Sequence, residues 1–130
     1  MNQSNMRVFK EIPHSKFINC IDWAKNGSLI ATGDIDGHAR IFDINNKDEK
    51  FVLSNHGLGI KAIKFSDDSK SVITGGEDLH INICDVETKK RLGTWVSHSD
   101  WVTSLSFHPL ESKYFISSSL DGSIKLWDSN

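Results

Sequence analysis

Cysteine is scarce in this chain, and its scarcity excludes two kinds of protein. Two cysteines, Cys20 and Cys84, stand alone in stretches of alternating apolar residues. They have neither the paired spacing of a zinc site nor the density of a disulfide-stabilised secreted fold. We therefore expect a protein of a reducing compartment, the cytoplasm or the nucleus.

Long apolar runs and an excess of positive charge are also missing. No run approaches the roughly 20 apolar residues that a membrane helix needs, and the first residues lack the apolar region of a signal peptide. The 15 Lys and Arg residues against 17 Asp and Glu give a net charge of -2. Because a phosphate backbone requires a basic surface, neither direct nucleic-acid binding nor a membrane location is expected.

What the chain does have is internal repetition with a period near 42 residues. A histidine recurs at His14, His56 and His98, and several other markers keep the same frame. These markers are Trp23, Phe65 and Phe107, then Asp36, Asp78 and Asp121, then the closing pairs Phe42-Asp43, Cys84-Asp85 and Trp127-Asp128. The frame predicts three units, at about 14–55, 56–97 and 98–130, within one segment that covers 1–130.

Each unit shows the pattern of β-strands. Its apolar residues alternate over short runs instead of recurring at helical spacing, and hairpin-forming pairs such as Asn26-Gly27 separate the runs. The sequence therefore predicts an all-β chain with four antiparallel strands in each unit. The stretch 6–12 has the position of an outer strand, so we expect it to complete another unit.

Units of this length and pattern resemble the WD-repeat family of β-propeller blades. The resemblance covers 6–128; Trp127-Asp128 is a full signature, Phe42-Asp43 is a common variant and Cys84-Asp85 departs from it. The segments 16–18, 33–44 and 93–102 are similar to later blades of the WD-repeat subunits of superkiller-type RNA-decay complexes. The resemblance implies a β-propeller segment, half or a fragment of a six- or seven-bladed ring.

The resemblance also implies a buried polar network in each blade. In the WD-repeat pattern the turn aspartate accepts a hydrogen bond from the histidine, the histidine meets a strand Ser or Thr, and that hydroxyl meets the Trp ring N–H. The implied network residues are His14, Thr32, Asp36, His56, Thr74, Asp78, His98, Ser117, Asp121 and Trp127.

His98, Ser117 and Asp121 have the composition of a catalytic triad, which makes a hydrolase the rival function from another class. Since the same set recurs in all three units, and an enzyme rarely needs three copies, a structural network is the better interpretation. The six histidines lack a close, repeated ligand spacing, so no metal site is expected. We expect no catalytic residue and no cofactor.

Binding residues are expected where the repeat permits variation. By resemblance, such positions open onto the narrow top face of a propeller, where partners commonly dock. An apolar patch with Lys61 and Glu77 at its rim is typical of a binding hot spot, although Phe17 or Trp101 could instead pack between blades. The predicted top-face residues are Phe17, Asn19, Ile35, Lys61, Glu77, Trp101, Thr103 and Leu120.

These features predict a non-catalytic scaffold that binds other proteins, in an RNA-decay or transcription-associated complex. One alternative is a substrate receptor of a ubiquitin ligase. Another is a reader of chromatin peptides, which would need acidic residues to cage a modified lysine, and Glu77 is the one candidate.

Three blades are too few for a ring, since propellers typically have about four to eight. The stretch 6–12 has no inner strands before it, and the last unit lacks an outer strand. We therefore expect a two-fold homodimer that forms one six-bladed ring, with 6–12 of each chain pairing with 123–127 of the other. The competing interpretation is a fragment of a longer, perhaps seven-bladed protein.

Overall fold

The computed structural model describes residues 5–46 and 50–130, and within these ranges every regular element is a β-strand. No helix that could cross a membrane occurs in this part of the chain. The strands are β1 (Ile18–Trp23), β2 (Leu29–Asp34), β3 (His38–Asp43), β4 (Lys50–Asn55), β5 (Ile60–Phe65), β6 (Ser71–Gly76), β7 (His80–Asp85), β8 (Arg91–Val96), β9 (Val102–Phe107), β10 (Tyr114–Ser119) and β11 (Ile124–Asp128).

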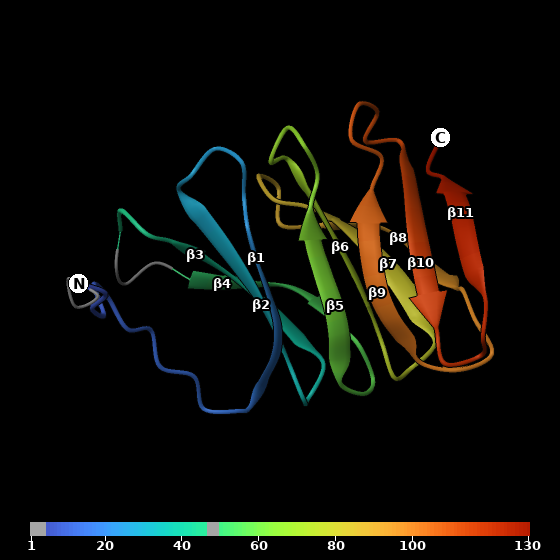
Figure 1. The fold of residues 1–130 in the computed structure, drawn as a ribbon, viewed down its shortest axis with the longest axis horizontal. Coiled ribbons are helices and arrows are strands. Elements are labelled where there is room, and N and C mark those ends of the chain that lie inside the picture. Colours follow the sequence, from blue (N-terminus) through green and yellow to red (C-terminus); the bar gives the residue numbers. More distant parts are fainter. Residues whose placement is uncertain (1–4, 47–49) are drawn as a thin grey trace.

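The strands form three antiparallel sheets, which we call blades 1, 2 and 3. Blade 1 has the order β1-β2-β3-β4, blade 2 has β5-β6-β7-β8, and blade 3 has β9, β10 and β11. The blades follow one another across the molecule, and their first strands β1, β5 and β9 lie next to one another (Figure 1). This arrangement confirms the predicted all-β propeller segment.

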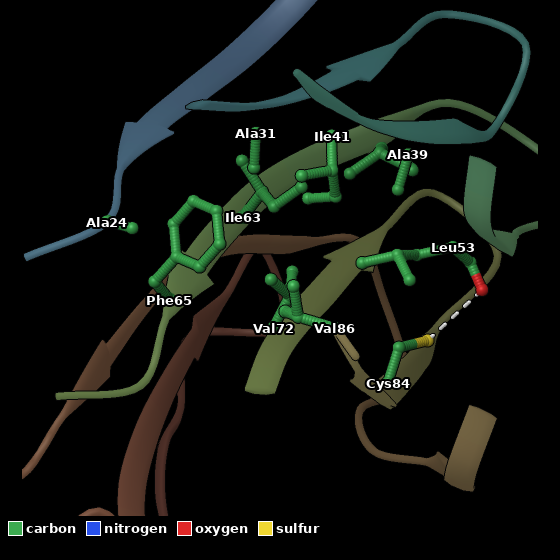
Figure 2. Close-up of a cluster of buried hydrophobic side chains, with 11 residues drawn as sticks. Ala24, Ala31, Ala39, Ile41, Leu53, Ile63, Phe65, Val72, Cys84 and Val86 are labelled. Atoms are coloured by element: carbon green, nitrogen blue, oxygen red, sulfur yellow. Dashed lines mark hydrogen bonds between the residues drawn. The ribbon is translucent and has the colours of Figure 1, made fainter. Parts of the chain in front are cut away.

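The core lies between the blades. At the junction of blades 1 and 2, small side chains of blade 1 such as Ala24 and Ala31 lie beside the larger Phe65 and Ile63 of blade 2 (Figure 2). At the next junction, Ala62 and Ile81 are among the blade 2 residues that pack against blade 3. Each blade therefore has a back face that accepts the front face of the next blade.

A tight turn joins the second and third strands of each blade, and one residue of each turn has a positive φ. These residues are Gly37 (φ 92), Leu79 (φ 70) and Gly122 (φ 87). In blades 1 and 3 the pairs Asp36-Gly37 and Asp121-Gly122 thus form turns with the positive φ that glycine tolerates best.

Two features at the ends of the arc differ from those of a complete ring. Blade 3 has three strands, and residues 6–12 form no strand within the described chain. Met6, Val8 and Phe9 are exposed, whereas the Lys10 Nζ donates to the Ile44 carbonyl at 2.9 Å. The prediction that 6–12 completes another blade stays a prediction.

Candidate functional site

In blade 3, a chain of hydrogen bonds runs from a turn aspartate to a tryptophan. The Trp127 Nε1–H donates to Ser117 Oγ at 2.8 Å, and Ser117 Oγ lies 2.7 Å from His98 Nε2. His98 Nδ1 lies 2.9 Å from the Asp121 carboxylate, which also accepts from the Ser123 hydroxyl. In the neutral ring, Nδ1–H donates to Asp121 and Nε2 accepts from Ser117, so each group takes a compatible role.

Blade 2 builds the same arrangement around His56. Its Nδ1 lies 2.8 Å from Asp78 Oδ1 and its Nε2 lies 2.7 Å from Thr74 Oγ1. The buried Asn82 adds its amide nitrogen 3.3 Å from Nε2, a contact that the sequence pattern did not reveal. Cys84 stands where blade 3 has Trp127, and its thiol is directed to the Leu53 carbonyl at 3.4 Å (Figure 2).

Blade 1 departs from the expected network at its turn aspartate. His14 Nε2 lies 2.9 Å from Thr32 Oγ1, but its Nδ1 is 3.3 Å from the Ile12 carbonyl. Asp36, which we expected to accept from His14, instead forms an ion pair with Lys16 at 3.4 Å. The half-buried His14 therefore lies in a looser network than His56 or His98.

The carboxylate that holds the blade 1 turn is Asp34. Its buried Oδ1 accepts the backbone N–H groups of Asp36, at 2.9 Å, and His38, at 3.0 Å. In blade 3 these two bonds are divided between the Ser119 hydroxyl and Asp121. In blade 1 Asp34 accepts both hydrogen bonds, and Asp36 pairs with Lys16 instead. Asp34 and Asp36 both stand at this turn in the sequence, which does not say which of them holds it.

The network is placed to hold the blades together and is poorly placed for chemistry. Ser117 is 1% exposed and His98 is buried, so a substrate could not reach the hydroxyl that a hydrolase would use. Within the described residues, no group of three or more His, Cys, Asp and Glu side chains could hold a metal ion. Burial raises the pKa of the Cys20 thiol to about 12, which keeps it protonated and unreactive.

The environment of His56 predicts a pH-dependent stability. Burial lowers the pKa of His56 below its ordinary value of 6.5, so the unfolded chain binds a proton that the folded chain does not. Stability contributed by this group is complete above about pH 6.5 and is lost as the pH falls below it. We expect a lower urea midpoint at pH 5.5 than at pH 7.5. His56→Gln, which cannot titrate, should reduce this difference, and equal wild-type midpoints would contradict the prediction.

Asp78 does not contribute to the expected change in stability between pH 7.5 and 5.5. Burial alone would raise its pKa, but hydrogen bonds from His56 and from the backbone N–H groups of His80 and Gly57 lower it below the ordinary value of 3.8. A carboxylate with a lowered pKa stabilises the fold above about pH 3.8 and loses its contribution below that pH. The change between pH 7.5 and 5.5 therefore reports on histidine.

The predicted top-face residues lie at the end of the blades where β1, β5 and β9 begin, at the lower edge of Figure 1. One backbone bond, repeated in each blade, joins the loop before the first strand to the turn after the second. It runs from Ile35 N to the Phe17 carbonyl, from Glu77 N to that of Gly59, and from Leu120 N to that of Trp101, at 2.9–3.1 Å. These bonds place Phe17 beside Ile35 and Trp101 beside Leu120.

A chain of charged and aromatic groups connects blades 2 and 3 on this face. Lys61 Nζ lies 3.6 Å from the Glu77 carboxylate and 5.1 Å from the centre of the Trp101 ring. The Trp101 ring of blade 3 therefore contacts the side-chain cation of Lys61, which belongs to blade 2. A contact of this kind stabilises one orientation of the indole by about 0.5–1 kcal/mol at an exposed site.

Predicted top-face residues of blades 1 and 3 lie on either side of blade 2. Trp101 is 38% exposed and Leu120 is 58% exposed on blade 3, while Phe17 and Ile35 are exposed on blade 1. Asn19 Nδ2 donates to the Ile60 carbonyl, at 3.1 Å, and the Thr103 and Ser118 hydroxyls are 3.0 Å apart. Asn19 thus ties blade 1 to blade 2. Phe17 is 79% exposed, so it does not pack between two of the described blades.

Comparison with known proteins agrees with this architecture. The family model described as "WD domain, G-beta repeat" matches residues 5–43, 47–85 and 89–128. These matches cover most of the sequence, and the chain belongs to the WD-repeat family. Proteins of this family are generally non-catalytic scaffolds that bind other proteins.

Relatives of the chain have varied names. A guanine nucleotide-binding protein subunit beta-like protein of Encephalitozoon cuniculi is 31% identical over 119 residues, which are 88% of this chain and 35% of that protein. The protein transport protein sec13 of Aspergillus clavatus is 25% identical, over 95% of this chain and 50% of that protein. A ribosome biogenesis protein WDR12 homolog of Dictyostelium discoideum is 26% identical, over 90% of this chain and 26% of that protein. The chain spans half or less of the length of these relatives.

Proposed function

We propose that this protein is a non-catalytic scaffold that binds segments of other proteins on its top face. The observation that carries the proposal is the position of Trp101. It is partly exposed beside the exposed Leu120, and Lys61 of the neighbouring blade supports its ring. An aromatic anchor within a rim of polar groups is the usual composition of a binding hot spot.

The rigidity of the face supports the same proposal. The loops that carry Phe17 and Trp101 are each joined to the adjacent turn by a backbone hydrogen bond. Lys61, which is paired with Glu77, also contacts the face of the Trp101 ring. A partner would meet side chains that are already ordered, so less conformational entropy is lost on binding.

We place the protein in an RNA-decay or transcription-associated assembly of the cytoplasm or nucleus, on the similarity of its segments 16–18, 33–44 and 93–102 to superkiller-type subunits. The named relatives include a protein transport protein and a ribosome biogenesis protein, so the proposal rests on the general role of the family and not on any one relative.

The alternative of a modified-lysine reader has weaker support. Such a reader needs an acidic group that is available to the ligand, but the Glu77 carboxylate is already paired with Lys61. To bind the cation of a ligand, Glu77 would have to release Lys61. The contact between Lys61 and the Trp101 ring would then be disturbed. A substrate receptor of a ubiquitin ligase would use the same apolar anchor, and its ligase partner would distinguish it.

The test of the proposal separates binding from folding. Tagged wild-type protein and Trp101→Ala would be used to recover partners from the native cell extract, followed by affinity measurement with the recovered partner. We expect Trp101→Ala to weaken binding about 30-fold, the loss of about 2 kcal/mol that defines a hot spot, with a thermal unfolding midpoint close to that of wild type. Leu92→Ala is the matched control, because Leu92 is exposed on the outer strand β8. Equal binding by all three proteins would contradict the proposal.

A further inference from the structure

The front face of blade 1 is uncovered at residues that are buried one repeat later. Trp23 is 60% exposed, whereas Phe65, 42 residues further on, is 7% exposed. The same contrast holds for the other apolar residues of β1. The exposed residues are Ile18, Ile21 and Trp23, and their buried equivalents in β5 are Ile60, Ile63 and Phe65. In blade 2 these positions contact the back face of the preceding blade.

The back face of blade 3 is uncovered in the complementary way. Leu126 is 81% exposed, although its equivalent Ile83 packs against the core between blades 2 and 3. The exposed residues are Ile116, Ile124 and Leu126, and their equivalents in blade 2 are Ile73, Ile81 and Ile83. An apolar groove continues this face to the end of the blade, where Tyr114, Pro109 and Trp127 line it.

The same end of the molecule has an open strand edge. β3 pairs with β4 and β7 pairs with β8, but among the described residues β11 pairs on one side only, with β10. The segment with the matching repeat position is the exposed stretch 7–12, which lies 84 residues before β8 (Arg91–Val96). It therefore has the sequence position of the fourth strand that blade 3 lacks.

We propose that a second copy of this chain covers these surfaces. The front face of blade 1 in each copy packs on the back face of blade 3 in the other, and residues 7–12 pair with β11 of the other copy. Two such junctions related by a two-fold axis close a ring of six blades. The assembly does not depend on the proposed top-face binding, because it uses blade faces and strand edges.

The identity of the occupant follows from the repeat. Each new junction would reproduce the one already present between blades 1 and 2 and between blades 2 and 3, with the same positions on both sides. The two complementary surfaces lie at opposite ends of the arc, so the three described blades cannot cover both of them (Figure 1). A second copy can satisfy both at once.

The internal blades also give the register of the new strand pair. Phe51 lies opposite Ile41 in blade 1, and Gly93 lies opposite Ile83 in blade 2. The same positions at the new edge are Phe9 of one copy and Leu126 of the other. Lys10 would then lie opposite Lys125, a like-charge pair that opposes association, so salt should strengthen the dimer modestly.

A disulfide between copies tests both the partner and the register. One preparation carries Phe9→Cys and the other Leu126→Cys, and the two are mixed and oxidised. Residues directly opposite in antiparallel strands have the Cα separation that a disulfide requires. We expect a linked dimer in the mixture and little in either preparation alone, because equivalent positions lie on opposite sides of the ring. Linkage that is equal in the mixture and in single preparations would overturn the register, and no linkage would overturn the strand exchange.

The mass in solution gives the second readout. We expect light scattering to show a sharp species at twice the 14.6 kDa chain mass. Ile21→Glu puts a charge on the front face and should weaken dimerisation at least about tenfold, since a charge without a partner is costly to bury. Leu92→Glu, on the outer strand of blade 2, should leave the dimer intact. A monomer or a broad distribution of aggregates in the wild type would overturn the proposal, whatever the result for Trp101→Ala.

Discussion

Gly37→Ala is expected to destabilise the fold by about 3 kcal/mol or more. Gly37 has φ 92, in a region that residues with a Cβ rarely adopt. A Cβ built on it would lie 2.1 Å from the His56 carbonyl oxygen and 2.6 Å from that of Leu58. Both obstacles are backbone atoms at the start of blade 2. The turn cannot accept the methyl group unless blades 1 and 2 move apart, which would open the core between them.

Gly27→Ala is the control for this prediction. Gly27 also has a positive φ, of 80, but no atom lies within 4 Å of a Cβ built there. The loss of stability in Gly27→Ala should therefore be limited to the backbone strain of about 1–2 kcal/mol. Urea denaturation gives the free energy of unfolding of each variant. The difference between the two values measures the effect of the close approach between the blades. Equal losses would show that strain alone accounts for the effect of Gly37→Ala.

The internal repeat was the feature of the sequence from which the fold could be predicted. Markers spaced 42 residues apart predicted three blades because each one serves the same purpose at the same place in a blade. The short alternating runs predicted strands, and every regular element in the described residues is a strand. Such features are local or periodic, so one chain is enough to reveal them.

Contacts that depend on two competing groups could not be read in this way. The pattern assigned Asp36 to the blade 1 network, whereas Asp34 takes the N–H groups of the turn and leaves Asp36 to Lys16. Both carboxylates lie within reach of the same turn, and the geometry of the turn decides between them. Placement of Lys61 under Trp101 likewise depends on how two blades are set against each other. The frame predicted both residues for the top face, but it could not predict their contact.

His56→Ala should cost about 2–4 kcal/mol of stability, whereas His14→Ala should cost about 1 kcal/mol or less. The two histidines occupy the same repeat position, so the comparison keeps the substitution and the local sequence role constant. His56 is buried and contacts Asp78, Thr74 and Asn82 through its ring. His14 is half-buried and its ring contacts Thr32 and a carbonyl.

The difference between these two losses measures the effect of burial on the network. Removing His56 takes a donor from the Asp78 carboxylate and leaves a cavity at the start of blade 2, where little water can enter because the ring is fully covered. Removing His14 exposes Thr32 to solvent at the open end of the arc, where water can replace the imidazole. Urea midpoints of both variants at pH 7.5 give the comparison. Similar losses would mean that the turn aspartate adds nothing to the stability of blade 2. A larger loss for His14→Ala would mean that blade 1 is held by its histidine and not by Asp34.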